Sequence, residues 1–397
     1  IMTITSSNRF SRIILITVVA LLSMFSFMSL KPAAASAATY SVVSSSNMTK
    51  TAYHRASSKG AVYNLSHTKK LANLSSYPNT TWYATKKVTL KHGSTKAIYY
   101  AVKNGAGTVS GYVWHSYLAK GKAPLTLKYA KAAVAMDAKT DKVLWSKNAN
   151  TPRAIASVSK LMTLYLVEQK VANTGSTWNS KVTTSYSGLK RMGTSSVYGG
   201  FKFTQNSYTV KQLYQAALIE SSNNAAIALG QWVAGGSTPS YNTKFISMMN
   251  AQAKKWNLGN ATYVSANGME QSALRSYGYS VSGGDANMVS AKDVALIAKH
   301  LITDYPAVLT DSSRGSLTVA GQLCYNYNNL LPGRKYYDSA LKVDGLKTGY
   351  TALAGYCFVG TGQKSGHDRL ITVVLHDEDE FTETRSLMQY VYARNLI

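Results

Sequence analysis

Hydrophobic and polar positions follow three different patterns along this chain of 397 residues. An apolar run extends from Ile13 to about Leu30. Residues 40–122 instead carry short alternating runs divided by Gly, Asn and Lys, which is typical of strands and turns. After the stretch AKGKAPLT (119–126), longer apolar segments with a helical repeat follow. The patterns predict a leader and two domains, and a chain of this length can bury a core in both.

The first apolar run has the features of an export signal. Arg9 and Arg12 precede it, and Ala35-Ser36-Ala37 offers a cleavage site of small residues. We therefore expect residues 1–37 to be a signal peptide. The run is also long enough to cross a bilayer if it is not cleaved, so a retained anchor remains the alternative.

Residues 40–122 are predicted to form a small β-barrel. The segments TTWYATKKVTL, KAIYYAVKNG and TVSGYVWHSYLAK have the pattern of strands, with little continuous helical period. The closing part, with Asn104-Gly105, Gly111-Tyr112-Val113-Trp114 and Leu118, resembles the SH3-like GW modules of Gram-positive surface proteins. The resemblance implies a module that binds wall polymers, on a secreted, extracytoplasmic protein associated with the cell wall of a Gram-positive bacterium.

The charge of the chain is distributed unevenly. Lys and Arg number 43 against 17 Asp and Glu, which gives a formal net charge of +26. No acidic residue precedes Asp137, so every charged side chain from Thr39 to Leu127 is basic. A field of one sign favours a polyanionic partner. For an exported protein we expect an anionic cell-wall polymer such as teichoic acid, or a membrane surface, rather than nucleic acid.

The second domain, residues 123–397, is predicted to be α+β. AAVAMDAKTDKVLWSKN (132–148) has the pattern of a strand, a polar turn and a second strand. The periodic segments that follow predict helices near 157–171, 210–219, 223–233, 243–256, 291–303 and 380–393, and strands near 340–347, 353–361 and 369–376. Helices in the middle with strands at both ends predict a sheet that joins the N- and C-terminal segments of the domain.

Cysteine and histidine give no sign of a metal or cofactor site. Cys324 and Cys357 could form a disulfide in an exported protein, but we favour two unpaired buried thiols. The seven histidines show no paired spacing such as HxxxH. No metal and no cofactor are therefore expected.

The segment IASVSKLMT (155–163) places a lysine in an apolar helix. A three-residue step brings Ser157 and Lys160 to one face, with Ser157 at the helix start, where unpaired backbone N–H groups favour negative charge. A serine nucleophile needs a base for its proton and donors for the resulting oxyanion. Burial and a second nearby cation would lower the pKa of Lys160 until it could act as that base. Alone, SxxK is a weak motif.

Two further motifs follow along the chain. Ser221 and Asn223 interrupt the run AALIESSNNAAIAL, either as a helix cap or as polar groups presented to a cleft. Lys347-Thr348-Gly349 follows a short apolar strand, either as an ordinary turn or as a cation, a hydroxyl and a glycine that allows close backbone approach. SxxK, SxN and KTG in this order are the set found in serine β-lactamases and penicillin-binding proteins.

Residues from about Ala132 to Leu387 resemble the low-molecular-mass penicillin-binding D-alanyl-D-alanine carboxypeptidases. The likeness rests on the stretches IASVSKLMT, IESSNNAA, MMNAQAKKWNLGNATYVSANGM, SAKDVALIAKHL, NNLL and VDGLKTGYTALAGYC. It implies a β-lactamase/DD-peptidase-like fold, an antiparallel sheet with flanking helices. It also implies a peptidoglycan stem peptide as substrate and β-lactam antibiotics as covalent inhibitors.

The resemblance implies an acyl-enzyme mechanism. Ser157 would attack the carbonyl between two terminal D-alanines, with Lys160 as general base. Ser221 would relay a proton towards the leaving amine, and the backbone N–H groups of Ser157 and Tyr350 would form the oxyanion hole. Water would then hydrolyse the acyl-enzyme, which makes the protein a serine D-alanyl-D-alanine carboxypeptidase.

The resemblance also implies a set of substrate-binding residues. Lys347 and Thr348 would recognise the terminal carboxylate, together with Arg369 on the strand DRLITVVL. The expected substrate-binding residues are Asn223, Lys347, Thr348, Gly349, Tyr350 and Arg369.

The sequence departs from the family at several positions. Tyr350 stands where many relatives have His after KTG, and Asn224 stands where Asp is usual after SxN. Cys357 stands where relatives usually have a residue other than cysteine. The stretch 270–289 has the length of an enlarged loop that could shape specificity. The extra C-terminal domain and tail of many relatives do not follow the last helix, so we expect the basic N-terminal module to anchor the protein.

Three other functions stay open. A DD-endopeptidase would use the same chemistry on peptidoglycan cross-links. A class A β-lactamase needs a glutamate to activate the deacylating water, but Glu270 lacks the sequence context of that residue. A wall adhesin with an inactive peptidase fold is disfavoured because all the catalytic groups are present. The tripeptide Tyr327-Asn328-Asn329 could take the place of the SxN motif, but the predicted helices around Ser221 suit that motif better.

Overall fold

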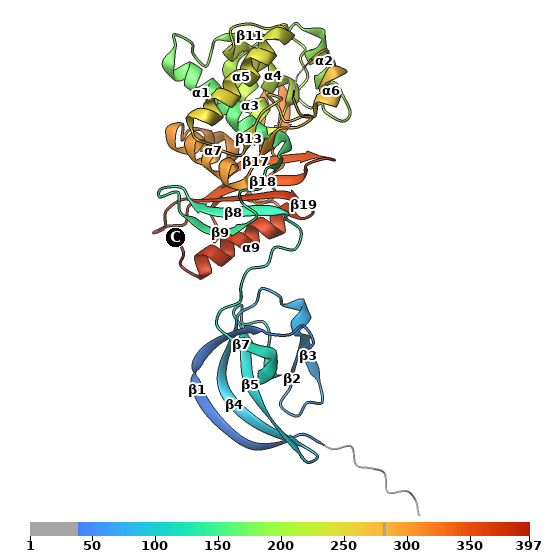
Figure 1. Cartoon of the computed structure of the whole chain (residues 1–397), viewed down its shortest axis with the longest axis vertical. Coiled ribbons are helices and arrows are strands. Elements are labelled where there is room, and N and C mark those ends of the chain that lie inside the picture. Colours follow the sequence, from blue (N-terminus) through green and yellow to red (C-terminus); the bar gives the residue numbers. More distant parts are fainter. Residues whose placement is uncertain (1–38, 281–282) are drawn as a thin grey trace, which may run out of the picture. The chain divides into compact units, whose positions relative to one another are not determined.

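The computed structural model describes residues 39–280 and 283–397 (Figure 1). The predicted signal peptide, residues 1–37, lies outside the described residues. The chain divides into two compact units, Ile1–Ala123 and Pro124–Ile397, and the division falls within the stretch AKGKAPLT (119–126). Within the described ranges, no helix is long and apolar enough to cross a membrane.

The first unit is a seven-stranded antiparallel sheet with the strand order β3-β2-β6-β5-β4-β1-β7. Its strands curve strongly in Figure 1. The strands are β1 Ser41–Arg55, β2 Ala61–Tyr63, β3 Lys70–Asn73, β4 Trp82–His92, β5 Thr95–Asn104, β6 Ser110–Trp114 and β7 Leu118–Lys120, with 3-10 turns η1 Leu74–Ser76 and η2 His115–Tyr117. The unit is thus all-β, as the alternating pattern predicts, whereas its SH3-like GW character stays a prediction.

Strand β4 shows how the lysines of this unit reach its surface. Trp82, Val88 and Leu90 are buried, while Lys87 and Lys91 are exposed. Successive side chains of a strand point to opposite faces, so the apolar residues fill the core and the lysines stay in water. The alternation therefore gives the unit a basic exterior around a small apolar core.

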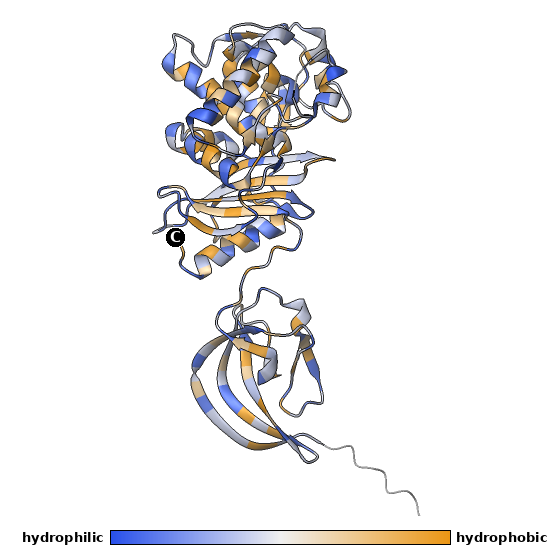
Figure 2. Ribbon diagram, viewed as in Figure 1, coloured by the Kyte–Doolittle hydropathy of each residue, from blue (hydrophilic) through white to orange (hydrophobic). Residues whose placement is uncertain are grey.

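The second unit is built on a five-stranded antiparallel sheet with the order β17-β18-β19-β8-β9. Its strands are β8 Ala132–Asp137, β9 Val143–Lys147, β17 Val343–Thr351, β18 Gly355–Gly362 and β19 Leu370–Asp377. The hairpin of β8 and β9 joins the C-terminal strands, as the sequence predicts. The apolar colours concentrate on the central strands in Figure 2.

Both faces of the central sheet are covered. In β8, Val134 and Met136 pack into the core shared with the helices, while Ala133 and Ala135 pack with α9 (Glu380–Ala393). Figure 1 shows α9 on one side of the sheet and the remaining helices on the other. Strands that are buried on both faces read as continuous apolar runs, which explains the uninterrupted AAVAM of β8.

The helices form a layer between the sheet and the far end of the unit (Figure 1). They are α1 Lys160–Asn173, α2 Ser187–Gly193, α3 Val210–Ile219, α4 Asn223–Val233, α5 Pro239–Lys255, α6 Gln271–Arg275, α7 Ala291–Asp304 and α8 Val308–Ser312, with the 3-10 turn η3 Ala156–Ser159 before α1. Short strands lie between them and form one three-stranded sheet, β10-β14-β13, and two pairs, β11-β12 and β15-β16: β10 Arg153–Ala154, β11 Lys181–Thr183, β12 Ser207–Thr209, β13 Ala261–Thr262, β14 Met288–Val289, β15 Ser316–Val319 and β16 Gln322–Tyr325.

Two local predictions are corrected by the helices. The helix expected from residue 157 begins with the 3-10 turn η3, and its α-helical part starts at Lys160. Helix α5 begins earlier than the sequence pattern predicts, at Pro239, because proline is pre-organised for the first position of a helix. Cys324 and Cys357 are both buried and unpaired, as favoured from the sequence.

Candidate active site

Lys160 is buried at the start of α1, where its amine meets the serine of the preceding turn. As an ammonium, Nζ donates hydrogen bonds to Ser157 Oγ at 2.7 Å, to Asn223 Oδ1 at 2.8 Å and to the Asn267 carbonyl oxygen at 2.8 Å. A neutral amine has two N–H groups and one lone pair. Asn223 and Asn267 can take those two N–H groups, so the lone pair is left to accept from the Ser157 hydroxyl.

The environment favours that neutral form. Burial lowers the pKa of Lys160 well below its ordinary value, and the nearby charge of Lys347 lowers it further. Lys347 is itself buried, which lowers its pKa to about 7, and its Nζ donates to the Thr348 carbonyl at 3.0 Å. Two buried amines with lowered pKa values are therefore placed where the sequence motifs predict a base and a second cation.

Ser221 lies in the short connection between α3 and α4 with a strained backbone. Its φ of 66° is in the left-handed region that side chains rarely adopt. The helix cap is formed instead by Ser222, whose hydroxyl accepts from the Ala225 N–H at 3.3 Å and donates to Asn224 Oδ1 at 2.6 Å. The cap therefore does not occupy Ser221, whose side chain lines the cavity described below.

Asn223 is the first residue of α4, and both ends of its amide are oriented. Its Oδ1 accepts from Lys160, and its Nδ2 donates to the Tyr198 carbonyl at 3.0 Å. The amide nitrogen carries two N–H groups, so one remains for a substrate carbonyl. Asn224, which stands where relatives usually have Asp, donates to the Phe201 carbonyl at 3.0 Å.

Strand β17 carries the third motif against the nucleophile turn. A Cβ at Gly349 would lie 3.0 Å from the backbone nitrogens of Ser157 and Val158 and 3.1 Å from the Ile155 carbonyl. Only glycine lets the strand pack this closely on η3. Tyr350, the next residue, is exposed. The N–H groups of Ser157 and Tyr350 thus belong to two backbone segments in direct contact.

A cavity of about 390 Å³ is lined by most of the predicted site residues, but not by Lys160, Lys347 or Arg369. Its walls include the site residues Ser157, Ser221, Asn223, Thr348, Gly349 and Tyr350. Two carboxyl residues that sequence reasoning missed, Glu220 and Glu380, also line it, and burial raises the pKa of each. Among the described residues, no group of three His, Cys, Asp or Glu side chains is arranged to hold a metal ion.

Two backbone contacts of this site were also missed in the sequence. The Asn267 carbonyl accepts from Lys160, and the carbonyl of Tyr198 accepts from Asn223. The stretch YVSANGM contains Asn267, but a carbonyl contact leaves no residue-type signal. These contacts could be found only from the fold.

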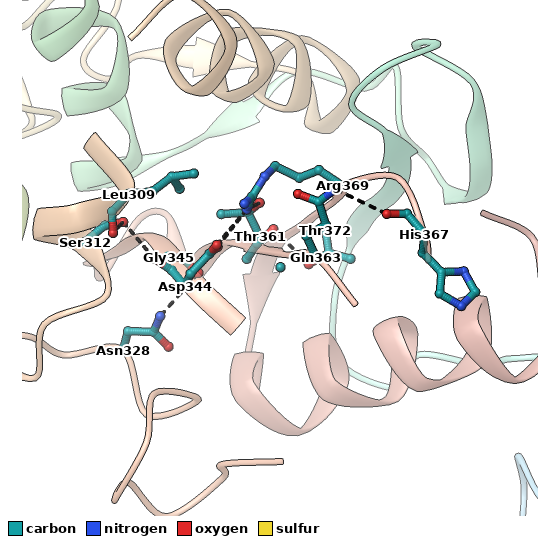
Figure 3. A network of polar contacts seen from close by, with 12 residues as sticks. Leu309, Ser312, Asn328, Asp344, Gly345, Thr361, Gln363, His367, Arg369 and Thr372 are labelled. Carbon is teal, nitrogen blue, oxygen red and sulfur yellow. Dashed lines mark hydrogen bonds and ion pairs between the residues drawn. The ribbon is translucent and has the colours of Figure 1, made fainter. Parts of the chain in front are cut away.

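Arg369 does not lie among the residues that line this cavity, which corrects its predicted role. Its Nη1 donates to both oxygens of Asp344 at 2.8 Å and to Thr361 Oγ1 at 3.1 Å (Figure 3). The guanidinium thus reaches across β18 to Asp344 at the start of β17, and not to Lys347 or Thr348, which lie further along that strand. The register of the sheet agrees, because Leu370 pairs with Gly362 on β18 and Gly362 pairs with Val343 on β17.

The comparison with known families agrees with the fold and the site. A model of the peptidase S11 family, described as D-alanyl-D-alanine carboxypeptidase, matches residues 120–379. The chain therefore belongs to the D-alanyl-D-alanine carboxypeptidase family S11, within the penicillin-binding proteins that the fold and motifs define. The family assignment made from the motifs is confirmed.

Individual relatives match the second unit. The D-alanyl-D-alanine carboxypeptidase DacC of Escherichia coli is 32% identical over 268 residues, which are 66% of this chain and 60% of DacC. PBP3 of Streptococcus pneumoniae, described as a peptidoglycan synthesis regulatory factor, superposes with a TM-score of 0.63 at 37% identity over 68% of this chain and 72% of its own. The chain thus spans about 60% of the length of the curated relatives it matches.

Two further comparisons bear on inhibitors and alternative activities. Penicillin-binding protein D2 of Listeria monocytogenes, solved in an ampicillin-bound form, has a TM-score of 0.55 at 31% identity over 68% of this chain and 99% of its own. A D-alanyl-D-alanine endopeptidase of Escherichia coli is 27% identical over 237 residues, 57% of this chain and 65% of its own. Proteins named for either cleavage are therefore similar to this chain.

Proposed function

We propose that the protein is a serine-type D-alanyl-D-alanine carboxypeptidase that removes the terminal D-alanine from peptidoglycan pentapeptide stems. The observation that carries the proposal is the contact of 2.7 Å between Ser157 Oγ and a buried lysine whose pKa is lowered. A neutral amine at that distance can take the hydroxyl proton as the oxygen attacks. Family membership supplies the substrate class.

The acylation step follows from the positions of the polar groups. Ser157 Oγ forms a bond to the penultimate D-alanine carbonyl, and its proton passes to Lys160 Nζ. The oxyanion is held by the N–H groups of Ser157 and Tyr350. The C–N bond then breaks, and a proton passes through the Ser221 hydroxyl to the leaving amine. Water hydrolyses the ester and returns the proton to Ser157.

The terminal carboxylate is assigned to the KTG motif. Thr348 lines the cavity and offers a hydroxyl, while Lys347 lies behind it as a buried cation. A bound carboxylate favours the charged form of Lys347, so substrate binding raises a pKa that burial has lowered to about 7. The charge of Lys347 then keeps Lys160 neutral while the substrate is in place.

One experiment separates this proposal from its rivals. Purified protein is incubated with a pentapeptide stem, a cross-linked stem dimer and benzylpenicillin, and the products are weighed by mass spectrometry. Loss of one alanine from the pentapeptide is the expected result, and cleavage of the dimer instead supports the endopeptidase. Fast penicillin turnover without alanine loss supports a β-lactamase. Labelling by penicillin that persists in Ser157→Ala would remove Ser157 as the nucleophile.

We also propose that the first unit attaches the exported enzyme to an anionic wall polymer such as teichoic acid. It has no acidic residue, and a hollow of about 350 Å³ on it is lined by the rings of Tyr40, Tyr63, His67, Tyr99, Trp114 and Tyr117 together with Lys59. His67 stacks on Tyr40 and on Tyr63, with ring centroids 4.2 and 4.4 Å apart. Flat rings suit the C–H faces of sugars or polyols, and lysines suit phosphates.

The attachment is tested by binding of the full chain to purified wall polymer. Because the attraction is between charges in water, binding is expected to weaken steeply as salt rises from low to physiological ionic strength. Trp114→Ala should weaken binding without changing penicillin labelling, whereas an exposed residue outside the hollow, such as Leu71→Ala, should not. Binding that is insensitive to salt would refute the charge-driven account.

A further inference from the structure

Two cavities share the nucleophile Ser157 and extend from it past different residues. The first contains Ser221 and Thr348. The second, of about 510 Å³, shares Ser157, Asn223 and Tyr350 with it but extends past residues 351–353 and 268–273. On the proposed function, the leaving alanine lies beside Ser221 and Thr348. The rest of the stem, which stays attached to Ser157 as the acyl group, must then lie in the second cavity.

Among the described residues that line the second cavity, Glu270 carries the one carboxylate and none is basic. Its side chain is half-buried, and in the described part of the chain no hydrogen bond or ion pair of its carboxylate is recorded. Basic residues outnumber acidic ones by 43 to 17 in this chain. Glu270 therefore has no partner cation among the described residues, so a positively charged group of the substrate can bind to its carboxylate.

The position of Glu270 relative to Ser157 is fixed by the residues before it. Gly268 has a φ of 87°, and a Cβ there would lie 1.8 Å from the Ala156 carbonyl oxygen and 2.9 Å from the Ser157 nitrogen. The carbonyl of Asn267 accepts from Lys160. The strand of backbone that leads to Glu270 is therefore packed directly against the turn that carries the nucleophile.

The residues after Glu270 fix it from the other side. The Glu270 carbonyl accepts from the Leu274 N–H at 3.1 Å as α6 begins. Ser272 N–H donates to Asp285 Oδ1 at 3.0 Å, and Gln271 N–H donates to the Asp285 carbonyl at 2.9 Å. Glu270 thus lies on a segment held at both ends, as a residue that selects substrates must be.

We propose that Glu270 binds the side-chain ammonium of a diamino acid at the third position of the stem, next to the D-alanine that becomes the acyl group. The inference rests on the proposed function and adds its substrate class: a stem whose third residue carries a free amine. A carboxylate and an ammonium in a half-buried wall form a charge-assisted hydrogen bond, which is stronger than one between neutral groups. Glu270 selects the substrate and takes no part in the bond-breaking steps.

The test compares two pentapeptides that differ only at the third residue, lysine in one and Nε-acetyl-lysine in the other. The wild-type protein is expected to release D-alanine from the lysine peptide with kcat/KM about tenfold higher. In Glu270→Gln that preference should disappear, while the rate of acylation by benzylpenicillin, which has no ammonium, stays within about twofold. Glu378→Gln removes an equal charge from an exposed residue outside both cavities and should retain the preference.

A charge reversal separates recognition from a structural role. Glu270→Lys is expected to prefer a peptide with glutamate at the third position, which a merely misfolded loop would not do. The inference is overturned if wild type shows no preference, or if Glu270→Gln slows both peptides and the deacylation of the penicilloyl-enzyme equally. Failure of wild type to release alanine from either peptide would instead remove the proposed function, and this inference with it.

Discussion

Lys347 and Lys160 are two buried amines of the active site, and a positive charge on one disfavours protonation of the other. Lys160 is fully buried on α1 and Lys347 is 2% exposed on β17, and the charge of Lys347 lowers the pKa of Lys160. No salt bridge to either amine is present in the described ranges of the chain. The pair therefore favours the state in which one amine is charged and the other neutral, which is the state that the proposed chemistry needs.

The rate of acylation by benzylpenicillin is expected to follow a bell-shaped pH profile. It rises with pH as Lys160 loses its proton, and it falls again as Lys347, with a pKa of about 7 in the free protein, loses the charge that binds a carboxylate. Replacing Lys347 by Met removes the neighbouring cation, so the pKa of Lys160 rises and the acidic limb moves to higher pH. An acidic limb that does not move in Lys347→Met would show that the amines are not coupled.

The same substitution is expected to stabilise the fold. A lysine whose folded pKa is about 7 and whose ordinary value is 10.5 binds fewer protons in the folded state between those values. The stability of the wild-type protein therefore falls as pH drops from 10.5 towards 7, by at most about 5 kcal/mol and in practice less because buried sites relax. Denaturant unfolding should find Lys347→Met more stable near pH 7, with the difference shrinking towards pH 10.

An exposed lysine supplies the control for that measurement. Lys292 lies exposed on α7, so Lys292→Met should leave the free energy of unfolding nearly unchanged at both pH values. If Lys347→Met were less stable than wild type at pH 7, the burial cost assigned to this amine would be wrong. A gain in stability with a loss of acylation would mark Lys347 as a residue kept for function.

The sequence predicted the main elements of the second unit because their patterns are strong. The continuous apolar run of β8 predicts a buried strand, and the periodic apolar residues of α3 and α4 predict two helices that pack on the core. The proximity of Ser157 and Lys160 follows from a three-residue step, which holds in the 3-10 turn as well as in an α-helix. Local spacing therefore predicted the part of the site that lies within one segment.

The rest of the site depends on contacts between distant segments, which no local pattern records. The contact of Asn267 with Lys160 uses a backbone carbonyl, which every residue has. The predicted role of Arg369 needed the register of the sheet, which places its side chain against Asp344 at the start of β17 and not against Lys347 or Thr348. The sequence left open whether Ser221 caps α4, because Ser221 and Ser222 are chemically alike; the cap is Ser222, and Ser221 has the strained φ.

Gly349→Ala is expected to reduce acylation by about 100-fold, the loss typical of one missing oxyanion donor. Its Cβ would lie 3.0 Å from the Ser157 and Val158 nitrogens, so β17 and η3 must move apart by a few tenths of an ångström. The fold should survive, because the shift is small. The measurement is the second-order rate of labelling by benzylpenicillin.

A matched glycine tests whether the effect is local. Gly259 has no atom within 4 Å of a Cβ built on it and no positive φ, so Gly259→Ala should label at the wild-type rate. Equal labelling by Gly349→Ala and wild type would mean that the two backbone segments do not need this close contact. It would also remove the Tyr350 N–H from the proposed oxyanion hole.

Arg369→Gln is expected to cost stability more than substrate recognition. Arg369 holds Asp344 through bonds of 2.8 Å to both carboxylate oxygens, and the side chains are only 20% and 28% exposed. Burial raises the pKa of Asp344 and Arg369 opposes that rise, so the variant leaves a partly buried carboxylate without its cation. We expect a loss of about 1–3 kcal/mol in the free energy of unfolding at pH 7.

The pH dependence and a second substitution decide what that loss means. Without Arg369 the pKa of Asp344 rises further, so the deficit should be present at neutral pH and shrink in acid as the carboxyl group becomes protonated. Arg369→Gln combined with Asp344→Asn should recover part of the stability, because no charge is then left unpaired. Thr348→Val, which removes a hydroxyl from the cavity, should raise KM for the pentapeptide more than Arg369→Gln does. If Arg369→Gln raised KM more than Thr348→Val and left stability unchanged, Arg369 would belong to the site that binds the terminal carboxylate, contrary to its contacts with Asp344.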